Sequence, residues 1–341
     1  MKITHVVDKG LSEGETARLS ALLCGLSDEF EVGLIAPENS ELVEVLGGTR
    51  VKILPLEEQK KRGPETTNVY NIARMVRREA PSVLHLGDSP IAAAAARLCG
   101  VGVIFSESAR GIFRSRYRAV LAPSPTEAYS AELIRRGVSP TRIKRLDCGV
   151  PPLSLSGEDE RVLVISKCLV PDEYRLVIAA LGRLSRGLRP TAEIFVPADE
   201  ISAAVRYAEL VCPTGLISVK DRRELSRRPL ERPAVFVYPV LNDSRLPLLP
   251  MRFMSAGVPV LLSDTPTSRE LLGGSGAFFF SVGDPFSLSE RLGALISDES
   301  LRRAASERVR GAWTARFSPE KMIEDYASLY RALRRVGVSD D

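Results

Sequence analysis

The sequence predicts an α/β protein with two doubly wound parallel sheets, and three observations lead to that fold class. Short apolar runs alternate with amphipathic stretches through both halves of the 341 residues, a pattern typical of strands joined by helical crossovers. The alternation is interrupted after residues 149–152 by a polar stretch at 154–160, which we interpret as a linker. The chain then ends in a capped helix. A chain of this length suits two domains.

The first domain is expected to cover residues 1–152. Its apolar runs predict strands at 3–7, 32–36, 51–54, 83–86, 101–106 and 119–122. Its amphipathic stretches predict helices at 15–26, 71–79, 91–98 and 126–137. In the first of these helices, Ala17, Leu19, Leu22 and Leu23 form one apolar side, as expected for a helix that covers a sheet.

The second domain is expected to cover residues 153–316. Strands are predicted at 162–165, 192–196, 234–238, 258–262 and 277–280, and helices at 174–183, 202–210, 250–256, 288–296 and 301–314. A last segment, 317–336, begins with Ser318 as a helix cap and Pro319 in the first turn, and its helix runs to about Arg335.

Composition excludes several classes of protein. Apolar residues make up 44% and charged residues 26% of the chain, the balance of a soluble globular protein. The net charge of +4 is small and its arginines are scattered, so nucleic-acid binding is not indicated, although a weak attraction to an anionic membrane or substrate stays open. No run of about eighteen apolar residues predicts a spanning helix, and the first residues do not resemble a signal peptide.

The cysteines and histidines argue against a metal site. Five cysteines occur without a CxxC pair, and His5 and His85 are the only histidines. A Cys/His metal centre is therefore not expected. We therefore expect the cysteines to be reduced thiols and the protein to be cytoplasmic. A peripheral contact of the protein with a membrane surface stays open.

The stretch from Pro233 to Pro285 has the most specific pattern. A strand, a loop and a helix that ends at Gly257 are followed by a second strand, which stops at Ser263-Asp264, and by a third. Four further phrases occur in the matching order: M-K-I-T-H-V-V, L-A-P-S-P-T-E-A-Y-S-A-E-L-I-R-R-G-V, L-D-C-G-V and R-F-S-P-E-K-M-I-E-D-Y-A-S-L-Y. Together they resemble the GT-B glycosyltransferases, family 4 in particular, over nearly the whole chain.

The resemblance implies a fold and an activity. The fold would be GT-B, with two Rossmann-like domains and a C-terminal helix that crosses back onto the first. The activity would be a retaining, metal-independent transfer of a hexosyl group from a nucleotide sugar to a glycan, lipid or small-molecule acceptor, as in polysaccharide biosynthesis. No cofactor is expected beside the nucleotide-diphosphate sugar, which is a substrate.

The resemblance also implies donor-binding residues. Basic side chains and helix N-termini would meet the charge of the diphosphate. Gly14 could let the diphosphate approach the backbone, although a capped loop without a ligand is the alternative. Ser166 and Lys167 fall where the family has a glycine followed by a phosphate-binding arginine, and Lys167 keeps the positive charge without bidentate geometry. It could equally be a solvated lysine at a strand end.

Several positions depart from the family pattern. The family's phosphate lysine falls on Asp172 or Glu173, whose carboxylates would repel a phosphate. Arg252 replaces the glutamate that accepts hydrogen bonds from the ribose, and a guanidinium can only donate. The family's first glutamate, which lies near the transferred sugar, falls on Ser244 by one count and on Asp243 by another, and Asp243 would keep an acid in this loop. Two interpretations stay open: a differently held anionic ligand, or drift in a site no longer used.

On the acceptor side the family's histidines are largely missing. His85 occupies an inward-facing position and is expected to be a hydrogen-bonded structural residue, while Gly87 stands at the position of the second imidazole. Asp88 could serve as an acid or base there, so Asp88 and Asp243 are the predicted catalytic residues. The basic stretch 110–118, with Phe113 and Tyr117, could contact a lipid or polymer, or it could be a solvated helix face.

Two hypotheses about function therefore remain. The first is an active glycosyltransferase whose partners are a nucleotide sugar and a glycan or lipid acceptor. The second is a catalytically inactive relative that binds glycan or an active partner glycosyltransferase. A Rossmann-type dehydrogenase is disfavoured because no GxGxxG follows a predicted strand.

Overall fold

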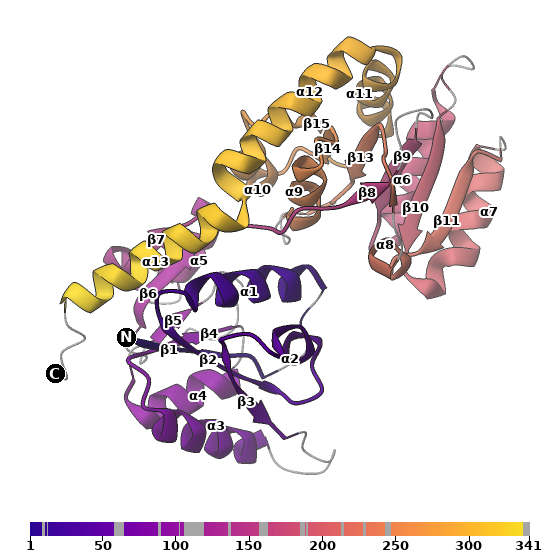
Figure 1. The fold of residues 1–341 in the computed structure, drawn as a ribbon. Helices are drawn as coiled ribbons and strands as arrows, with labels where there is room; N and C mark the ends of the chain where they lie inside the picture. Colours follow the sequence, from indigo (N-terminus) through magenta and orange to yellow (C-terminus); the bar gives the residue numbers. More distant parts are fainter. Residues whose placement is uncertain are drawn as a thin grey trace. The chain divides into compact units, whose positions relative to one another are not determined.

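The computed structural model describes residues 1–8, 11, 13–57, 65–87, 90–101, 103–105, 119–135, 138–156, 163–184, 188, 190–212, 215–227, 230–242 and 247–336. The chain forms two compact units (Figure 1). The N-terminal unit comprises Met1–Pro151 and Pro319–Asp341, and the C-terminal unit comprises Pro152–Ser318. Both contain a parallel sheet with helices on its faces, which confirms the predicted α/β class.

The sheet of the N-terminal unit has the order β3-β2-β1-β4-β5-β6-β7. Its strands are β1 (Lys2–Val6), β2 (Glu31–Pro37), β3 (Lys52–Leu56), β4 (Val83–Leu86), β5 (Val103–Phe105), β6 (Ala119–Ser124) and β7 (Ile143–Arg145). All neighbours pair in parallel, with β1 between β2 and β4. The residues of β4 are buried on both faces, as expected for an inner strand of a parallel sheet.

Helices cover both faces of this sheet. Helices α1 (Glu13–Leu26), α2 (Glu41–Leu46) and α13 (Pro319–Val336) lie on one face, and α3 (Glu65–Glu79) and α4 (Pro90–Cys99) lie on the other (Figure 1). Helix α5 (Glu127–Arg135) packs with α3 and α4 into the same apolar cluster. The sequence prediction named no element between residues 36 and 51, so it missed helix α2.

The last helix, α13, packs on the first helix of the chain. It turns a stripe of apolar and aromatic residues into the core that α1 and the sheet share: Met322, Tyr326, Leu329, Tyr330 and Leu333. A Cβ at Gly25 on α1 would lie 2.3 Å from Ile323 Cδ1, so the two helices approach closely because residue 25 has no side chain.

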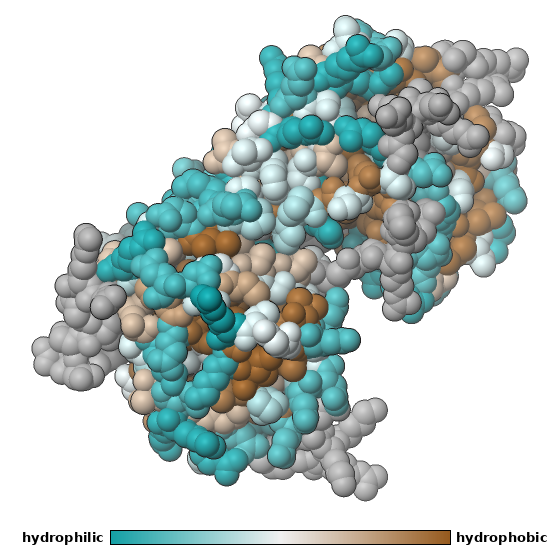
Figure 2. All heavy atoms as spheres, in the orientation of Figure 1, coloured by the Kyte–Doolittle hydropathy of each residue, from teal (hydrophilic) through white to brown (hydrophobic). Residues whose placement is uncertain are grey.

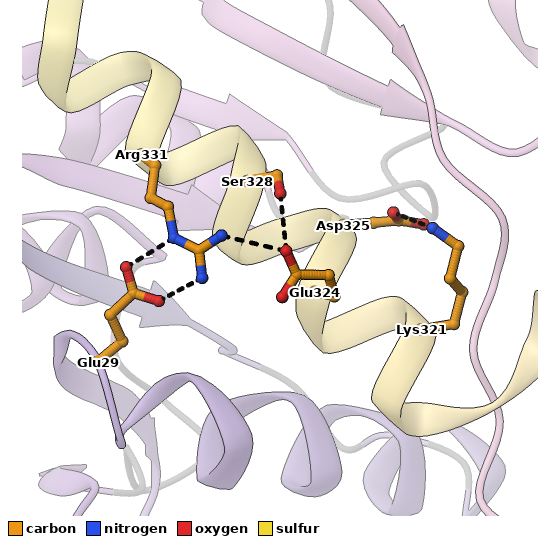
Figure 3. Close-up of polar contacts among 6 residues, drawn as sticks. All are labelled: Glu29, Lys321, Glu324, Asp325, Ser328 and Arg331. Atoms are coloured by element: carbon orange, nitrogen blue, oxygen red, sulfur yellow. Dashed lines mark hydrogen bonds and ion pairs between the residues drawn. The ribbon is translucent and has the colours of Figure 1, made fainter.

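The outer side of α13 is largely hydrophilic (Figure 2), and polar contacts hold it in place (Figure 3). The Arg331 guanidinium donates from Nε to Glu29 Oε1 at 2.8 Å and from Nη2 to Glu29 Oε2 at 2.7 Å. Its Nη1 also donates to Glu324 Oε1 at 3.1 Å on the same helix. This bidentate pairing connects the final helix to the turn that follows α1.

The sheet of the C-terminal unit has the order β11-β10-β9-β13-β14-β15, again with parallel pairing. Its strands are β9 (Leu163–Lys167), β10 (Thr191–Val196), β11 (Ile217–Asp221), β13 (Val235–Tyr238), β14 (Val260–Ser263) and β15 (Phe278–Phe280). A separate pair joins β8 (Leu155–Ser156), in the region interpreted as a linker, to β12 (Leu230–Glu231).

Helices α6 (Pro171–Gly182), α7 (Ile201–Val211) and α11 (Pro285–Ser297) share an apolar cluster with one face of this sheet. Helix α9 (Leu248–Ser255) packs against β13, β14 and α12 (Glu299–Ala312). The short helices α8 (Glu224–Arg227) and α10 (Pro266–Leu272) complete the unit. A π-helical turn, Trp313–Phe317, follows α12.

Three arginines from α12 and the π-helical turn cap the C-terminal ends of three other helices. Arg310 Nη2 donates to Ala256 O after α9 at 3.1 Å, and Arg316 Nη1 donates to Leu271 O in α10 at 3.1 Å. Arg302 Nη1 donates to Leu295 O and Ile296 O in α11, at 2.9 and 2.7 Å. Cations are favourable at these carbonyl ends, so α12 sets the positions of α9, α10 and α11.

Candidate functional site

The strand order of the C-terminal unit locates a candidate site. Strand β9 lies between β10 and β13, so the connections after β9 and β13 leave the sheet in opposite directions. In open parallel sheets a crevice forms at this reversal, beyond the carboxyl ends of the strands, and ligands bind there. We call the turn 168–170 after β9, together with residues 239–242 and 247 after β13, the switch-point site.

Two predicted donor residues, Ser166 and Lys167, end strand β9. The Ser166 side chain is fully buried, with its hydroxyl 3.5 Å from Cys168 Sγ. Lys167 is half-buried at the last position of the strand, paired in register with Phe195 of β10. The structure thus brings Lys167, rather than the Ser166 hydroxyl, to the edge of the switch-point site.

The side chain of Glu173 forms a hydrogen bond to the backbone of the turn between β9 and α6. Glu173 is 1% exposed, and its Oε2 accepts a hydrogen bond from Leu169 N at 2.6 Å. This contact resembles a capping box, in which a glutamate in the first helical turn reaches back to the backbone before it. Asp172 is exposed and pairs with Arg175 at 3.4 Å. Of the two acids, Glu173 therefore places its charge inside the turn.

The second helix at the site, α9, has a different N-terminus. Its first turn carries no acidic residue, and its cap residue, Pro247, offers no side-chain hydrogen bond. Because the positive end of a helix dipole and its N–H groups attract anions, a ligand phosphate is better accommodated beside α9 than beside α6. Asp243, Ser244 and Arg245, which precede this helix, lie outside the described residues.

Arg252 lies on α9 and is half-buried. Its sequence neighbours Met251 and Phe253 are fully buried, and Phe253 stacks on Phe236 of β13 with ring centroids 4.0 Å apart. Ser255 donates to Arg252 O at 2.6 Å and accepts from Leu153 N at 2.9 Å. The backbone around Arg252 is thus tied to the segment that enters the C-terminal unit.

The Ser263-Asp264 motif has a structural role. Asp264 Oδ1 accepts from Arg269 Nε at 2.8 Å, and the other carboxylate oxygen also pairs with this guanidinium. Arg269 in turn covers the Phe279 ring at 4.7 Å. Asp264 therefore anchors α10 to the end of β14.

In the N-terminal unit the strand order reverses between β1 and β4. Gly14 lies in the first turn of α1, and a Cβ added there would have no atom within 4 Å. Gly87 follows β4, and a Cβ added there would approach Val6 O, at 3.8 Å. The predicted catalytic residue Asp88 lies outside the described residues, as do Gly10 and Ser12 near Gly14.

A small cavity of about 40 Å³ lies at this reversal. Its lining includes His5, Arg18, His85, Gly87 and Tyr326. The His5 and His85 rings stack with centroids 4.4 Å apart, and Arg18 is 8% exposed. The volume is about that of one water molecule, so in this form the cavity is too small for a sugar.

His85 is a structural residue, as the sequence predicted. Its Nδ1 lies 2.8 Å from the Tyr330 hydroxyl. Burial, followed by the positive charge of Arg18, lowers the pKa of His85 to about 3, so the imidazole is neutral at physiological pH. Sequence reasoning missed Arg18, because an arginine among leucines on an amphipathic helix is usually solvated.

Neither a metal cluster nor a membrane helix is found in the described part of the chain. Among those residues no three or more His, Cys, Asp or Glu side chains are grouped to hold a metal ion. The helices searched there are also too short or too polar to span a membrane. The five cysteines, all described, form no disulfide.

Comparison with known proteins identifies the fold. No family model matches the sequence, and no curated protein matches it. Among solved structures, a glycosyltransferase from Rickettsia africae is similar over 99% of both chains, with 11% identity and a TM-score of 0.76. Alr3699/HepE from Anabaena, in complex with UDP-glucose, is similar over 98% of this chain and 100% of that one, with 12% identity and a TM-score of 0.77.

The same fold occurs in a protein of another class. A putative UDP-N-acetylglucosamine 2-epimerase from Listeria monocytogenes covers 98% of this chain and 97% of its own, with 13% identity and a TM-score of 0.66. The protein has the GT-B fold, which confirms the architecture expected from the resemblance. At these identities the likeness defines the fold, and the activity has to be argued from the site.

Proposed function

We propose that the protein is a glycosyltransferase that transfers a sugar from a nucleoside-diphosphate donor to a glycan, lipid or small-molecule acceptor. The observation that carries this proposal is the full-length structural likeness to HepE, a protein whose crystal structure contains UDP-glucose. Membership in family 4, retention of configuration and a cytoplasmic setting rest on the sequence and remain parts of the proposal.

The C-terminal unit would hold the nucleotide diphosphate at its switch-point site. Lys167 supplies a positive charge at the end of β9, and the acid-free N-terminus of α9 supplies backbone N–H groups. Arg252, on the same helix, adds a second cation. These groups would stabilise the charge that develops on the leaving diphosphate, the role that a metal ion plays in other enzymes.

The remaining assignments concern the reacting groups. Asp243 is proposed beside the transferred sugar, Asp88 as an acid or base toward the acceptor, and Gly14 as a point where the diphosphate approaches the backbone. A Cβ added at Gly14 would have no atom within 4 Å, and this open space supports the proposal that the diphosphate approaches the backbone there. Asp88 and Asp243 follow from the resemblance alone.

Calorimetry with UDP, GDP and ADP tests the nucleotide site. The intact protein should bind one of them, and Lys167→Ala should weaken that binding by about ten- to a hundredfold, because one charge-assisted hydrogen bond is lost. Lys144→Ala is the matched control, since Lys144 is an exposed lysine on β7 of the other unit. Transfer assays over a panel of UDP-, GDP- and ADP-sugars then test turnover.

The results of these assays distinguish a glycosyltransferase from an epimerase and from an inactive relative. Absence of binding to all three nucleotides at millimolar concentration would overturn the proposal. Conversion of UDP-N-acetylglucosamine to its 2-epimer would identify an epimerase instead. Binding of a nucleotide without transfer or hydrolysis would favour an inactive relative.

One observation favours that second candidate, a catalytically inactive protein that binds glycan or an active partner glycosyltransferase. The Glu173 carboxylate is buried in the turn where a phosphate-binding residue was expected, and it already accepts the Leu169 N–H. Restoring the family residues with Arg252→Glu and Gly87→His asks whether activity was lost at these positions. A Cβ at Gly87 would meet Val6 O at 3.8 Å, an ordinary contact, and circular dichroism checks that the double variant is folded before activity is compared.

A further inference from the structure

An arginine of α12 holds the C-terminal end of α9. The two helices lie side by side in the C-terminal unit (Figure 1). Arg310 Nη2 donates to Ala256 O at 3.1 Å, and Ala256 is the C-cap residue of α9. A cation is favourable at this carbonyl end of a helix, and a hydrogen bond from a charged donor is stronger than one from a neutral donor.

The approach of Arg310 to α9 depends on a glycine. Gly257 follows the helix with a φ of 70°. A Cβ added at Gly257 would lie 2.8 Å from Arg310 Nη2 and 3.0 Å from its Nε, so a side chain at this position and the guanidinium cannot occupy the same place. The chain therefore leaves α9 in a conformation that admits Arg310.

The other contacts of α9 include few that have a direction. Phe253 on its buried side stacks on Phe236 of β13, with ring centroids 4.0 Å apart. Apolar contacts are non-directional, so by themselves they tolerate a small slide or rotation of the helix. Hydrogen bonds have a defined distance and angle, and at this end of α9 they come from Leu153 N to Ser255 Oγ and from Arg310 to the C-cap carbonyl.

The opposite end of α9 lies at the switch-point site and offers few donors. Pro250 has no N–H, and Met251 N donates to Pro247 O at 3.3 Å. Leu248 and Leu249 therefore carry the N–H groups that the first turn can present to a ligand. The eight residues of α9 form a rod about 12 Å long, so a displacement at one end moves the donors at the other.

We propose that Arg310 is a positioning residue for the nucleotide diphosphate. It acts through α9: by holding the C-terminal end, it fixes the direction in which Leu248 and Leu249 present their N–H groups, and it fixes the place of Arg252 on the same helix. This inference rests on the proposed nucleotide site. It does not depend on turnover, so it applies equally to an inactive relative that binds a nucleotide.

The nucleotide affinity of the full-length Arg310→Gln variant tests the proposal. Calorimetry with UDP, GDP and ADP identifies the diphosphate that the unchanged protein binds, and ligand-observed NMR measures binding of uridine, guanosine or adenosine with the same base. Arg310→Gln should weaken binding of the diphosphate by about five- to twentyfold, because small misplacements of donors are costly. The nucleoside, which has no phosphate, should bind as it does to the unchanged protein.

The conservative variant Arg310→Lys should restore most of the diphosphate affinity, because an ammonium group can also donate to Ala256 O. A general loss of stability would weaken binding of the nucleoside and of the diphosphate alike. The difference between the two ligands therefore separates positioning of the phosphate donors from a merely structural role.

Arg302 provides a matched control on the same helix. Its Nη1 donates to Leu295 O and Ile296 O at the C-terminal end of α11. Helix α11 follows β15, which lies two strands from β13 in the sheet order and so about 10 Å from the switch-point site. Arg302→Gln should lower the unfolding temperature as Arg310→Gln does, but the affinity for the diphosphate should stay near that of the unchanged protein.

Gly257→Ala displaces the same guanidinium without removing it. This variant should also weaken diphosphate binding, and it should do so less in the Arg310→Gln background, where the contact is already lost. Gly274→Ala is its control, since φ is positive there as well and a Cβ would meet nothing within 4 Å. Gly274→Ala should keep the affinity of the unchanged protein.

The results distinguish failure of this inference from failure of the proposed function. A nucleotide that binds the unchanged protein and Arg310→Gln equally well would overturn the inference alone, and would show that the remaining contacts suffice to place α9. An equal loss in Arg302→Gln, or an equal loss of nucleoside and diphosphate binding, would also overturn it. Absence of binding of UDP, GDP and ADP to the unchanged protein would overturn the proposed function, and this inference with it.

Discussion

The imidazole of His85 on β4 and the phenol of Tyr330 on α13 lie 2.8 Å apart, although 245 residues separate them. Tyr330 is fully buried, and His85 is 4% exposed. A buried polar pair of this kind favours one arrangement of the packed elements, because each group would lose its partner in any other. The pair thus fixes the position of α13 against the centre of the N-terminal sheet.

We expect Tyr330→Phe to lower the free energy of unfolding by about 1–3 kcal/mol, because the ring still fills its place while the His85 Nδ1 loses its partner. Urea unfolding followed by circular dichroism measures the change. Tyr207→Phe on α7 is the control, since the Tyr207 hydroxyl has no hydrogen bond to another described residue. An equal effect of the two substitutions would show that the contact between Tyr330 and His85 contributes nothing to the free energy of unfolding.

Stability should fall in mild acid because of His85. Its pKa is lowered to about 3 in the folded protein, whereas an unfolded histidine titrates near pH 6.5. The unfolded chain therefore binds more protons between these values, and the folded state loses stability as the pH falls from about 6.5 toward 3. From pH 7 to pH 5 the loss from this group is about 2 kcal/mol.

The control for this pH dependence is His85→Gln, which has no titratable ring. The difference in unfolding free energy between pH 7 and pH 5 should be smaller in this variant by about the same 2 kcal/mol, whatever its absolute stability. The range above pH 5 keeps the titration of most carboxylates out of the comparison. Parallel pH profiles for the two proteins would contradict the assignment of a neutral, buried His85.

Gly257 should be less tolerant of a side chain than Gly274. Both have a positive φ, 70° and 79°, so alanine is strained at either position by about 1 kcal/mol. A Cβ at Gly257 would lie 2.8 Å from Arg310 Nη2 and from Ser306 Oγ, whereas at Gly274 it would meet nothing within 4 Å. The added atom at residue 257 displaces Arg310 from the Ala256 carbonyl.

We therefore expect Gly257→Ala to destabilise the C-terminal unit by about 1–2 kcal/mol more than Gly274→Ala does. Trp313, the single tryptophan of the chain, lies in this unit and reports its unfolding by fluorescence. If both variants unfold at the same denaturant concentration, the Arg310 cap contributes no stability.

Much of the fold could be predicted from local patterns. The strand expected at residues 192–196 matches β10, and Ser318 with Pro319 marks the start of α13, because apolar runs and helix caps are encoded locally. Helix α10 was missed although Thr265 caps it by accepting from Ser268 N and Pro266 follows. Its seven residues are too few to show a helical period.

The candidate site could be predicted only in part. Lys167 was placed correctly at the end of a strand, since its position depends on the preceding apolar run. The burial of Glu173 and its bond to Leu169 N could not be foreseen, because an acid in a first helical turn is usually solvated. Asp88 and Asp243 remain predictions.

The sequence alone determined the α/β class, the course of most strands and the resemblance to GT-B proteins, because these depend on the spacing of apolar residues and on short motifs. Only the tertiary structure decided the pairing of His85 with Tyr330, the depressed pKa of that histidine beside Arg18, and the joining of Arg310 to the end of α9. These relationships connect segments far apart in the chain. Their energies depend on burial and distance, which local sequence does not specify.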